Sequence, residues 1–178
     1  QWLDEGRHGG MIWMEERSAQ RAAPAALWSD VRSVIALGMS YAPARDPLAL
    51  ADEGERGRIS VYAQGGDYHD VVKRALKALG RWLAREAGCD LKVFVDTAPV
   101  MEKPLAQKAG IGWQGKHTNL VSRQFGSWLF LGSIFTTLEL PPDPAQAAAN
   151  QVTAKLVAVV PDGERLARIA ARFDAGEL

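Results

Sequence analysis

The sequence contains very little cysteine or histidine. Its 178 residues include one cysteine, Cys89, and three histidines, His8, His69 and His117. A single thiol cannot form an intrachain disulfide, a four-cysteine zinc site or an iron–sulfur cluster. The histidines show no paired metal-ligand spacing, which argues against a zinc ion held by protein side chains. We therefore expect a reducing, cytoplasmic setting and no protein-ligated metal.

The chain also lacks an excess of either charge and any long apolar run. Lysine plus arginine equals aspartate plus glutamate at 21 each, so net charge alone indicates no nucleic-acid or membrane partner, although local basic patches remain compatible with it. No apolar stretch approaches the roughly 20 residues that span a bilayer. The first residues lack an initiator methionine and the regions of a signal peptide, and we expect an N-terminal truncation.

Hydrophobic periodicity predicts an α/β (α+β) fold, with one main domain and a mixed sheet flanked by helices. Val72, Leu76 and Leu83 recur at helical spacing, in a helix that begins after Asp67 or Asp70 and ends at Gly88. Short helices and loops are expected over residues 1–30, and a second helix over 100–109. The predicted strands are residues 31–41, 91–96, 119–121 and 128–136, with a further short one at 59–63.

One clear boundary follows these elements. The run Pro141-Pro142-Asp143-Pro144 separates a main domain, residues 1–142, from a tail of unknown origin, residues 143–178. An alanine-rich stretch at 145–149 continues as a linker. The tail is predicted to contain a strand at 155–160 and a helix at 164–173.

Asp96 is the first candidate for chemistry. It ends an apolar strand, a place where α/β proteins commonly carry catalytic groups. Burial there would let its carboxyl group hold a proton for delivery to a substrate oxygen. The alternative is that Asp96 or Thr97, just ahead of Pro99, caps the helix that follows. Spacing alone favours the cap.

The run from Gly110 to Gly115 matches the dinucleotide-binding pattern G-x-G-x-x-G, but its context is wrong. That fingerprint follows a strand and opens a helix, whereas this run follows a predicted helix and leads to a strand. The acidic residue required about 20 residues later is also missing, because position 132 is glycine. The glycines let the backbone approach a large ligand closely, or Gly110 simply ends the helix.

Two polar clusters remain open to two interpretations. Lys116 and His117 follow the glycine run and could contact a phosphate or relay a proton, although spacing alone favours a solvated basic pair at the entry to a strand. Tyr68 and His69 could face a ligand, although a capped helix start explains them as well.

Five stretches in order give the sequence a family resemblance. They are Ser60-Val61-Tyr62-Ala63 with Gly66-Asp67-Tyr68-His69; Val95-Asp96-Thr97-Ala98-Pro99-Val100 with Glu102; Ala109-Gly110-Ile111-Gly112-Trp113 with Gly115-Lys116-His117-Thr118; Gly126-Ser127-Trp128 with Phe130-Leu131-Gly132; and Phe135-Thr136. Together they resemble the amino-terminal half of epoxyqueuosine reductase, a cobalamin-dependent enzyme. Agreement runs from about residue 2 to about residue 142.

The resemblance implies a reaction, a cofactor and a set of site residues. The reaction is the last step of queuosine biosynthesis, the reduction of epoxyqueuosine to queuosine at the wobble position of tRNA. A reduced cobalt centre works on the epoxide while an aspartate supplies a proton, and Asp96 matches that catalytic aspartate. The positions that match cobalamin contacts are Arg21, Ser60, Asp96, Leu120 and Leu131, with Lys116 and His117 matching in motif only.

The resemblance also implies a part that this chain does not contain. After the segment resembling residues 137–142, the family carries eight cysteines that bind two [4Fe-4S] clusters, and helical repeats that help hold tRNA. Cys89 is the only cysteine here, so we interpret the chain as a fragment that lacks the iron–sulfur part. A non-enzymatic cobalamin carrier and an unrelated flavin oxidoreductase are the alternatives. The implied partners are tRNA and an external electron donor, for a cytoplasmic monomer without membrane contact.

Overall fold

The main sheet of the protein is mixed, as predicted. The computed structural model describes residues 1–49, 51–141 and 153–158. Its main sheet has the strand order β2-β5-β1-β6, in which β1–β5 and β2–β5 are antiparallel and β1–β6 is parallel. The strands are β1 (Ser33–Ser40), β2 (Leu91–Phe94), β5 (Leu129–Thr136) and β6 (Thr153–Ala158), and a separate hairpin joins β3 (Trp113–Gln114) to β4 (Leu120–Val121).

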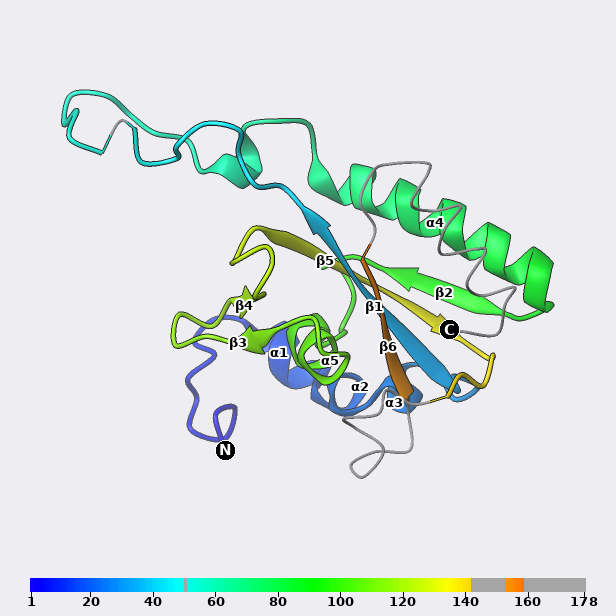
Figure 1. Cartoon of the computed structure of the whole chain (residues 1–178). Helices are drawn as coiled ribbons and strands as arrows, with labels where there is room; N and C mark the ends of the chain where they lie inside the picture. Colours follow the sequence, from blue (N-terminus) through cyan, green and yellow to red (C-terminus); the bar gives the residue numbers. More distant parts are fainter. Residues whose placement is uncertain (50, 142–152, 159–178) are drawn as a thin grey trace.

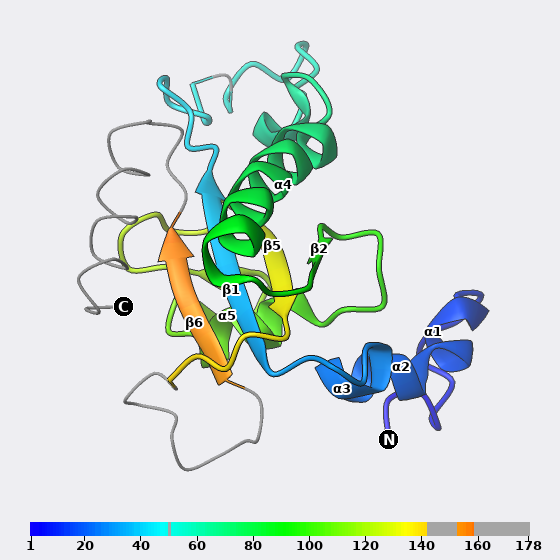
Figure 2. The same ribbon diagram turned by 90° about the vertical axis from the view of Figure 1, so that its right-hand side faces the viewer.

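The helices cover both faces of this sheet. They are α1 (Ile12–Glu16), α2 (Ser18–Ala22), α3 (Pro24–Leu27), α4 (Tyr68–Ala87) and α5 (Glu102–Lys108), with a 3-10 turn, Val61–Ala63, before α4. Figures 1 and 2 show α4 along one face, with α5 on the opposite face and the three short helices near one end of β1. The sheet therefore forms the middle layer.

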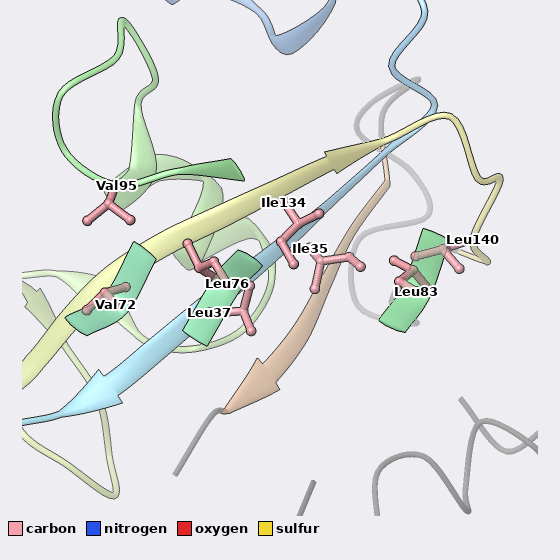
Figure 3. Close-up of a cluster of buried hydrophobic side chains, with 8 residues drawn as sticks. All are labelled: Ile35, Leu37, Val72, Leu76, Leu83, Val95, Ile134 and Leu140. Carbon is pink, nitrogen blue, oxygen red and sulfur yellow. The ribbon is translucent and has the colours of Figure 1, made fainter. Parts of the chain in front are cut away.

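Helix α4 forms because its sequence supplies both ends and an apolar stripe. The Asp67 carboxylate accepts the backbone N–H of His69 at 2.9 Å, and Gly88 ends the helix with a left-handed φ of 62°. The buried stripe packs on Ile35 and Ile134 of the sheet (Figure 3). Contact is close at Gly132, where an added Cβ would meet Leu76 at 2.8 Å.

Part of the opposite face is packed by small side chains. Alternation along β1 turns Ile35 and Leu37 toward α4 and turns Ala36 toward α5. Ala106 and Ala109 of the α5 segment pack against Ala36, together with Leu120 from the β3–β4 hairpin. Because the three alanine side chains are small, α5 and the hairpin lie close to the sheet. The turn between β2 and α5 therefore lies near the sheet as well.

Most of the predicted elements are confirmed, with two differences. Residues 59–63 contain the 3-10 turn rather than a strand, and β3 was not predicted. The predicted tail strand overlaps β6, which pairs with β1, while the predicted linker at 145–149 and helix at 164–173 lie outside the described residues. None of the helices in the described part of the chain is long and apolar enough to cross a bilayer.

Candidate active site

Asp96 lies at the end of β2 and lines a pocket of about 320 Å³. The walls combine aromatic and aliphatic side chains with a few polar ones, and come from the α4, α5, β4 and β5 regions. They include Tyr41, Tyr68, Glu102, Lys103, Asn119, Leu120, Ser127, Leu129, Phe130 and Leu131. A pocket that combines apolar walls with polar groups able to orient a ligand is a candidate small-molecule or cofactor site.

The Asp96 carboxylate is held by two neighbours from the start of α4. The Tyr68 hydroxyl donates a hydrogen bond to Asp96 Oδ2 at 2.8 Å, and His69 Nε2 lies 3.3 Å from the same oxygen. The expectation that Asp96 is buried is wrong, because its side chain is 64% exposed. The alternative of a helix cap is not supported either, since α5 has no side-chain cap and is preceded by Met101.

A column of aromatic rings supports this carboxylate. Tyr68 stacks on Phe130 at a centroid distance of 4.2 Å and on His69 at 4.0 Å, and Tyr41 stacks on the other side of Phe130 at 4.2 Å. Stacking fixes the planes of these rings and so the direction of the Tyr68 hydroxyl. The capped helix start is confirmed, because Asp67 caps α4, and both Tyr68 and His69 also contact Asp96, while a ligand contact by either remains a prediction.

His69 joins two carboxylates. Its Nδ1 lies 2.7 Å from Asp67 Oδ1, while its Nε2 faces Asp96. The hydrogen bond to Asp67 is the main cause that raises the pKa of His69 above its usual value of 6.5, and the bond to Asp96 adds to it. Both carboxylates therefore stabilise the protonated ring relative to the neutral one, and in that form His69 Nε2 places a proton next to Asp96.

Asp67→Asn is expected to lower the pKa of His69 toward 6.5, because the amide cannot stabilise the imidazolium as the carboxylate does. Since the folded pKa is raised, this pair stabilises the fold below the unfolded pKa, and that stability is lost as the pH rises through the folded pKa. NMR titration of the His69 ring checks the shift. Asp70→Asn, one residue beyond His69 on the exposed side of α4, is the control, and an unchanged His69 titration in Asp67→Asn would contradict the assignment.

Glu102 is the less exposed carboxyl group of the site. Its Oε1 accepts the backbone N–H of Asp96 at 3.1 Å. The pKa of Glu102 is raised to about 7, mainly by desolvation and also by the nearby Asp96 charge, while the hydrogen bond from the Asp96 N–H and the His69 charge act in the opposite direction. The site thus contains a carboxyl group, that of Glu102, which can carry a proton at neutral pH.

The other predicted residues lie in several places. Leu120 and Leu131 line the Asp96 pocket. Ser60 lines a neighbouring pocket of about 610 Å³, which shares Tyr41 and Tyr62 with the first, so the two pockets are adjacent. Arg21 lies apart from both, in a pocket of about 160 Å³ between α2 and α5.

Lys116 and His117 do not line the Asp96 pocket. Both are exposed in the turn before β4, and His117 Nε2 lies 3.3 Å from the hydroxyl of Ser127, which does line it. Their predicted cofactor contacts therefore remain predictions.

The glycine run serves the protein's own backbone. Gly110 ends the segment after α5 with a φ of 76°. An added Cβ on Gly112 would lie 2.1 Å from the carbonyl oxygen of Val121, and one on Gly115 would lie 2.6 Å from the His117 ring. The run follows helix α5 and leads into strand β3. A dinucleotide-binding run would instead follow a strand and open a helix, so the predicted context is confirmed.

Tyr68, His69 and Glu102 were not among the residues assigned to the site from the sequence. Each of them belongs to one of the family-like stretches, and this membership is the sequence feature that could have assigned them to the site. Spacing could not reveal the cluster, because the contacts join α4, the end of β2 and the start of α5 across 27 to 28 residues.

Comparison with known proteins identifies the relatives of this chain. The family model "Epoxyqueuosine reductase QueG, DUF1730" matches residues 21–97. Epoxyqueuosine reductase of Vibrio cholerae is 42% identical over 157 residues, covering 86% of this chain and 42% of the relative. That of Escherichia coli is 40% identical over 144 residues, covering 80% and 38%.

The chain is homologous to the epoxyqueuosine reductases. It spans about two fifths of the length of the curated relatives that it matches. The solved epoxyqueuosine reductase of Streptococcus thermophilus is 29% identical with a TM-score of 0.63, over 80% of this chain and 38% of that one. An epoxyqueuosine reductase bound to an epoxyqueuosine-modified tRNA-Tyr stem loop is 24% identical with a TM-score of 0.57, over 83% and 40%, and shares the fold.

Proposed function

We propose that this chain is the cobalamin-binding catalytic part of an epoxyqueuosine reductase, which reduces epoxyqueuosine to queuosine in tRNA. The observation that carries the proposal is the position of Asp96, which belongs to the family-like stretch and lines the pocket beside two proton-bearing side chains. Identity of about 40% to the curated reductases over most of this chain supports it. Residues 1–142 are proposed to form this domain.

The pocket residues fit a bulky cofactor with a flat ring system. Leu120, Leu129 and Leu131 offer apolar contacts, and the adjacent second pocket is lined by Ser60. Arg21 lines the separate pocket between α2 and α5, where its buried Nε finds no hydrogen-bond partner among the described residues and so is free to contact a polar group. We propose Asp96 and four further residues as cobalamin contacts, namely Arg21, Ser60, Leu120 and Leu131, with Lys116 and His117 as additional candidates.

When bound, cobalamin would supply the reducing chemistry at cobalt. The residues of this chain would position the modified base and supply a proton. Asp96 would donate a proton to the epoxide oxygen, acting as a general acid. His69 Nε2 can return a proton to Asp96 Oδ2, since the two atoms lie 3.3 Å apart and the neighbouring carboxylates raise the pKa of His69. Tyr68 holds that carboxylate in place during the transfer.

The proposed partners lie outside this chain. We propose that tRNA is the substrate carrier, that an external donor supplies electrons, and that two [4Fe-4S] clusters pass them on from a part of the enzyme whose cysteines this sequence does not contain. A cytoplasmic, monomeric enzyme fits this proposal.

Cobalamin titration is expected to give saturable binding with a Kd in roughly the micromolar range, seen as a change in visible absorbance. The pocket walls supply the binding energy because they remove apolar surface from water. Leu131→Asp should weaken binding at least about tenfold, since a charge would face the ring system. Leu48→Asp, on an exposed loop, is the matched control. Absence of saturable binding by the folded chain would contradict the proposal.

The cysteine content favours a second candidate, a cobalamin-binding module that does not itself turn over substrate. With Cys89 alone the chain cannot ligate a [4Fe-4S] cluster. The encoding locus discriminates between the two. A cysteine-rich continuation after codon 178 supports the enzyme, and a genuine stop supports the module.

A further inference from the structure

Asp96 has an unusual backbone conformation. Its φ is 53°, and among the described residues only Thr118 shares a positive φ without being glycine. The N–H of Thr97 donates to the carbonyl of Val95 at 2.5 Å, so Asp96 is the central residue of a three-residue turn. A positive φ at that position marks the rarer and more strained form of this turn. Some other contact must stabilise it.

Glu102 supplies that contact. Its carboxyl Oε1 reaches back six residues to accept the Asp96 N–H at 3.1 Å, and α5 itself has no side-chain cap. A mostly buried carboxyl group loses much of its hydration. Burying Glu102 therefore destabilises the folded state relative to a glutamate on the surface. The raised pKa of about 7 reflects this cost. A function of the contact to Asp96 would explain why the Glu102 carboxyl group is kept in this desolvated position.

The contact also fixes where the Asp96 side chain lies. The turn directs Asp96 Oδ2 toward the Tyr68 hydroxyl and His69 Nε2, and both Asp96 and Glu102 line the same pocket. A relaxed turn with negative φ would swing the Asp96 Cβ to a different direction. The three contacts to Asp96 therefore depend on one another.

We propose that Glu102 is a positioning residue for Asp96, whose carboxyl oxygen holds the Asp96 amide and so aims the Asp96 carboxyl group into the pocket. This inference rests on the proposed function, because it assigns a role within that site. Glu102 acts through Asp96 and needs no contact with the substrate. Its task requires a hydrogen-bond acceptor and not a charge.

Two variants of Glu102 separate this role from simple packing. Glu102→Gln keeps an acceptor oxygen and removes ionisation, and Glu102→Met keeps a similar volume without a carbonyl oxygen. In the cobalamin-loaded, full-length reductase that carries this segment, Glu102→Met is expected to lower kcat at least about tenfold with little change in KM or in cobalamin affinity, because a displaced acid slows the chemical step. Glu102→Gln is expected to stay within about threefold of the parent at neutral pH.

A second readout does not depend on activity. In this chain, the Asp96 amide proton is expected to shift with pH around a midpoint of about 7, following Glu102. The shift is expected to vanish in Glu102→Gln and the amide to move upfield in Glu102→Met. Glu86→Met, an exposed glutamate near the end of α4, is the control for an added methionine. If Glu102→Met does not fold, Glu102→Gln and the amide titration still decide.

The outcomes have distinct meanings. Parent kcat in folded Glu102→Met, equal losses in Glu102→Gln and Glu102→Met, or an Asp96 amide that ignores pH in the parent would each overturn the positioning role. Loss of cobalamin binding or an active Asp96→Asn enzyme would instead count against the proposed function, and the amide titration would still report whether Glu102 holds Asp96.

Discussion

Asp96→Asn is expected to abolish turnover in the full-length reductase that carries this segment while cobalamin binding is retained. Asparagine has nearly the same shape, accepts the Tyr68 hydrogen bond through its amide oxygen and can keep the turn, so the pocket should remain intact. It cannot donate an acidic proton. Loss of a general acid typically costs about 10²- to 10⁴-fold in rate.

The measurement is single-turnover conversion of modified tRNA, with cobalamin absorbance followed in parallel. Asp90→Asn is the matched control, since Asp90 is an exposed aspartate just before the opposite end of β2. Its turnover should equal that of the parent. Near-normal turnover in Asp96→Asn would remove Asp96 from the acid role, whereas joint loss of turnover and cobalamin binding would point to a damaged pocket.

Gly112→Ala is expected to destabilise the fold by about 3 kcal/mol or more, a large effect for one methyl group. The added Cβ would lie 2.1 Å from the carbonyl oxygen and 2.7 Å from the carbonyl carbon of Val121. Both atoms belong to the backbone of β4, so no side-chain rotation relieves the overlap. The hairpin would have to separate, and Leu120 in the pocket wall would move with it.

Urea unfolding of Gly112→Ala and the parent checks this, with cobalamin affinity as a second measurement. Gly57→Ala is the control, because nothing lies within 4 Å of a Cβ at that position. It should change stability by less than about 0.5 kcal/mol. A Gly112→Ala protein as stable as the parent would show that β3 and β4 do not approach each other as described.

Strong local patterns made much of the fold predictable. The α4 stripe, its Asp67 cap and Gly88 end give a helix whatever surrounds it, and the apolar β1 sequence gives a buried strand. The segment around Val61 was predicted wrongly because a short apolar run fits a strand or a turn equally well. The two-residue strand β3 depends on the close approach at Gly112, which is a tertiary contact.

The candidate site was less predictable than the fold. The family resemblance singled out Asp96, but its exposure and its left-handed conformation depend on the turn that Glu102 holds. The partial burial of Glu102 comes from the packing of α5 on the sheet, and no pattern within residues 96–102 reports it. Because the sequence does not report this burial, it predicted a buried carboxyl group with a raised pKa at Asp96. In the structure the carboxyl group with a raised pKa, of about 7, is that of Glu102, and burial is the main cause.

The position of β1 has a consequence for folding. It is the first strand in the chain, yet both of its neighbours come late, since Ser33 pairs with Thr136 on β5 and with Thr153 on β6. At roughly 5–20 residues per second, a ribosome needs several seconds after making β1 to produce its first partner. During that time an apolar strand has two unpaired edges, which is a known route to aggregation. Rapid docking of α4, which is made next and covers the Ile35 and Leu37 face, would protect the nascent chain until β5 emerges.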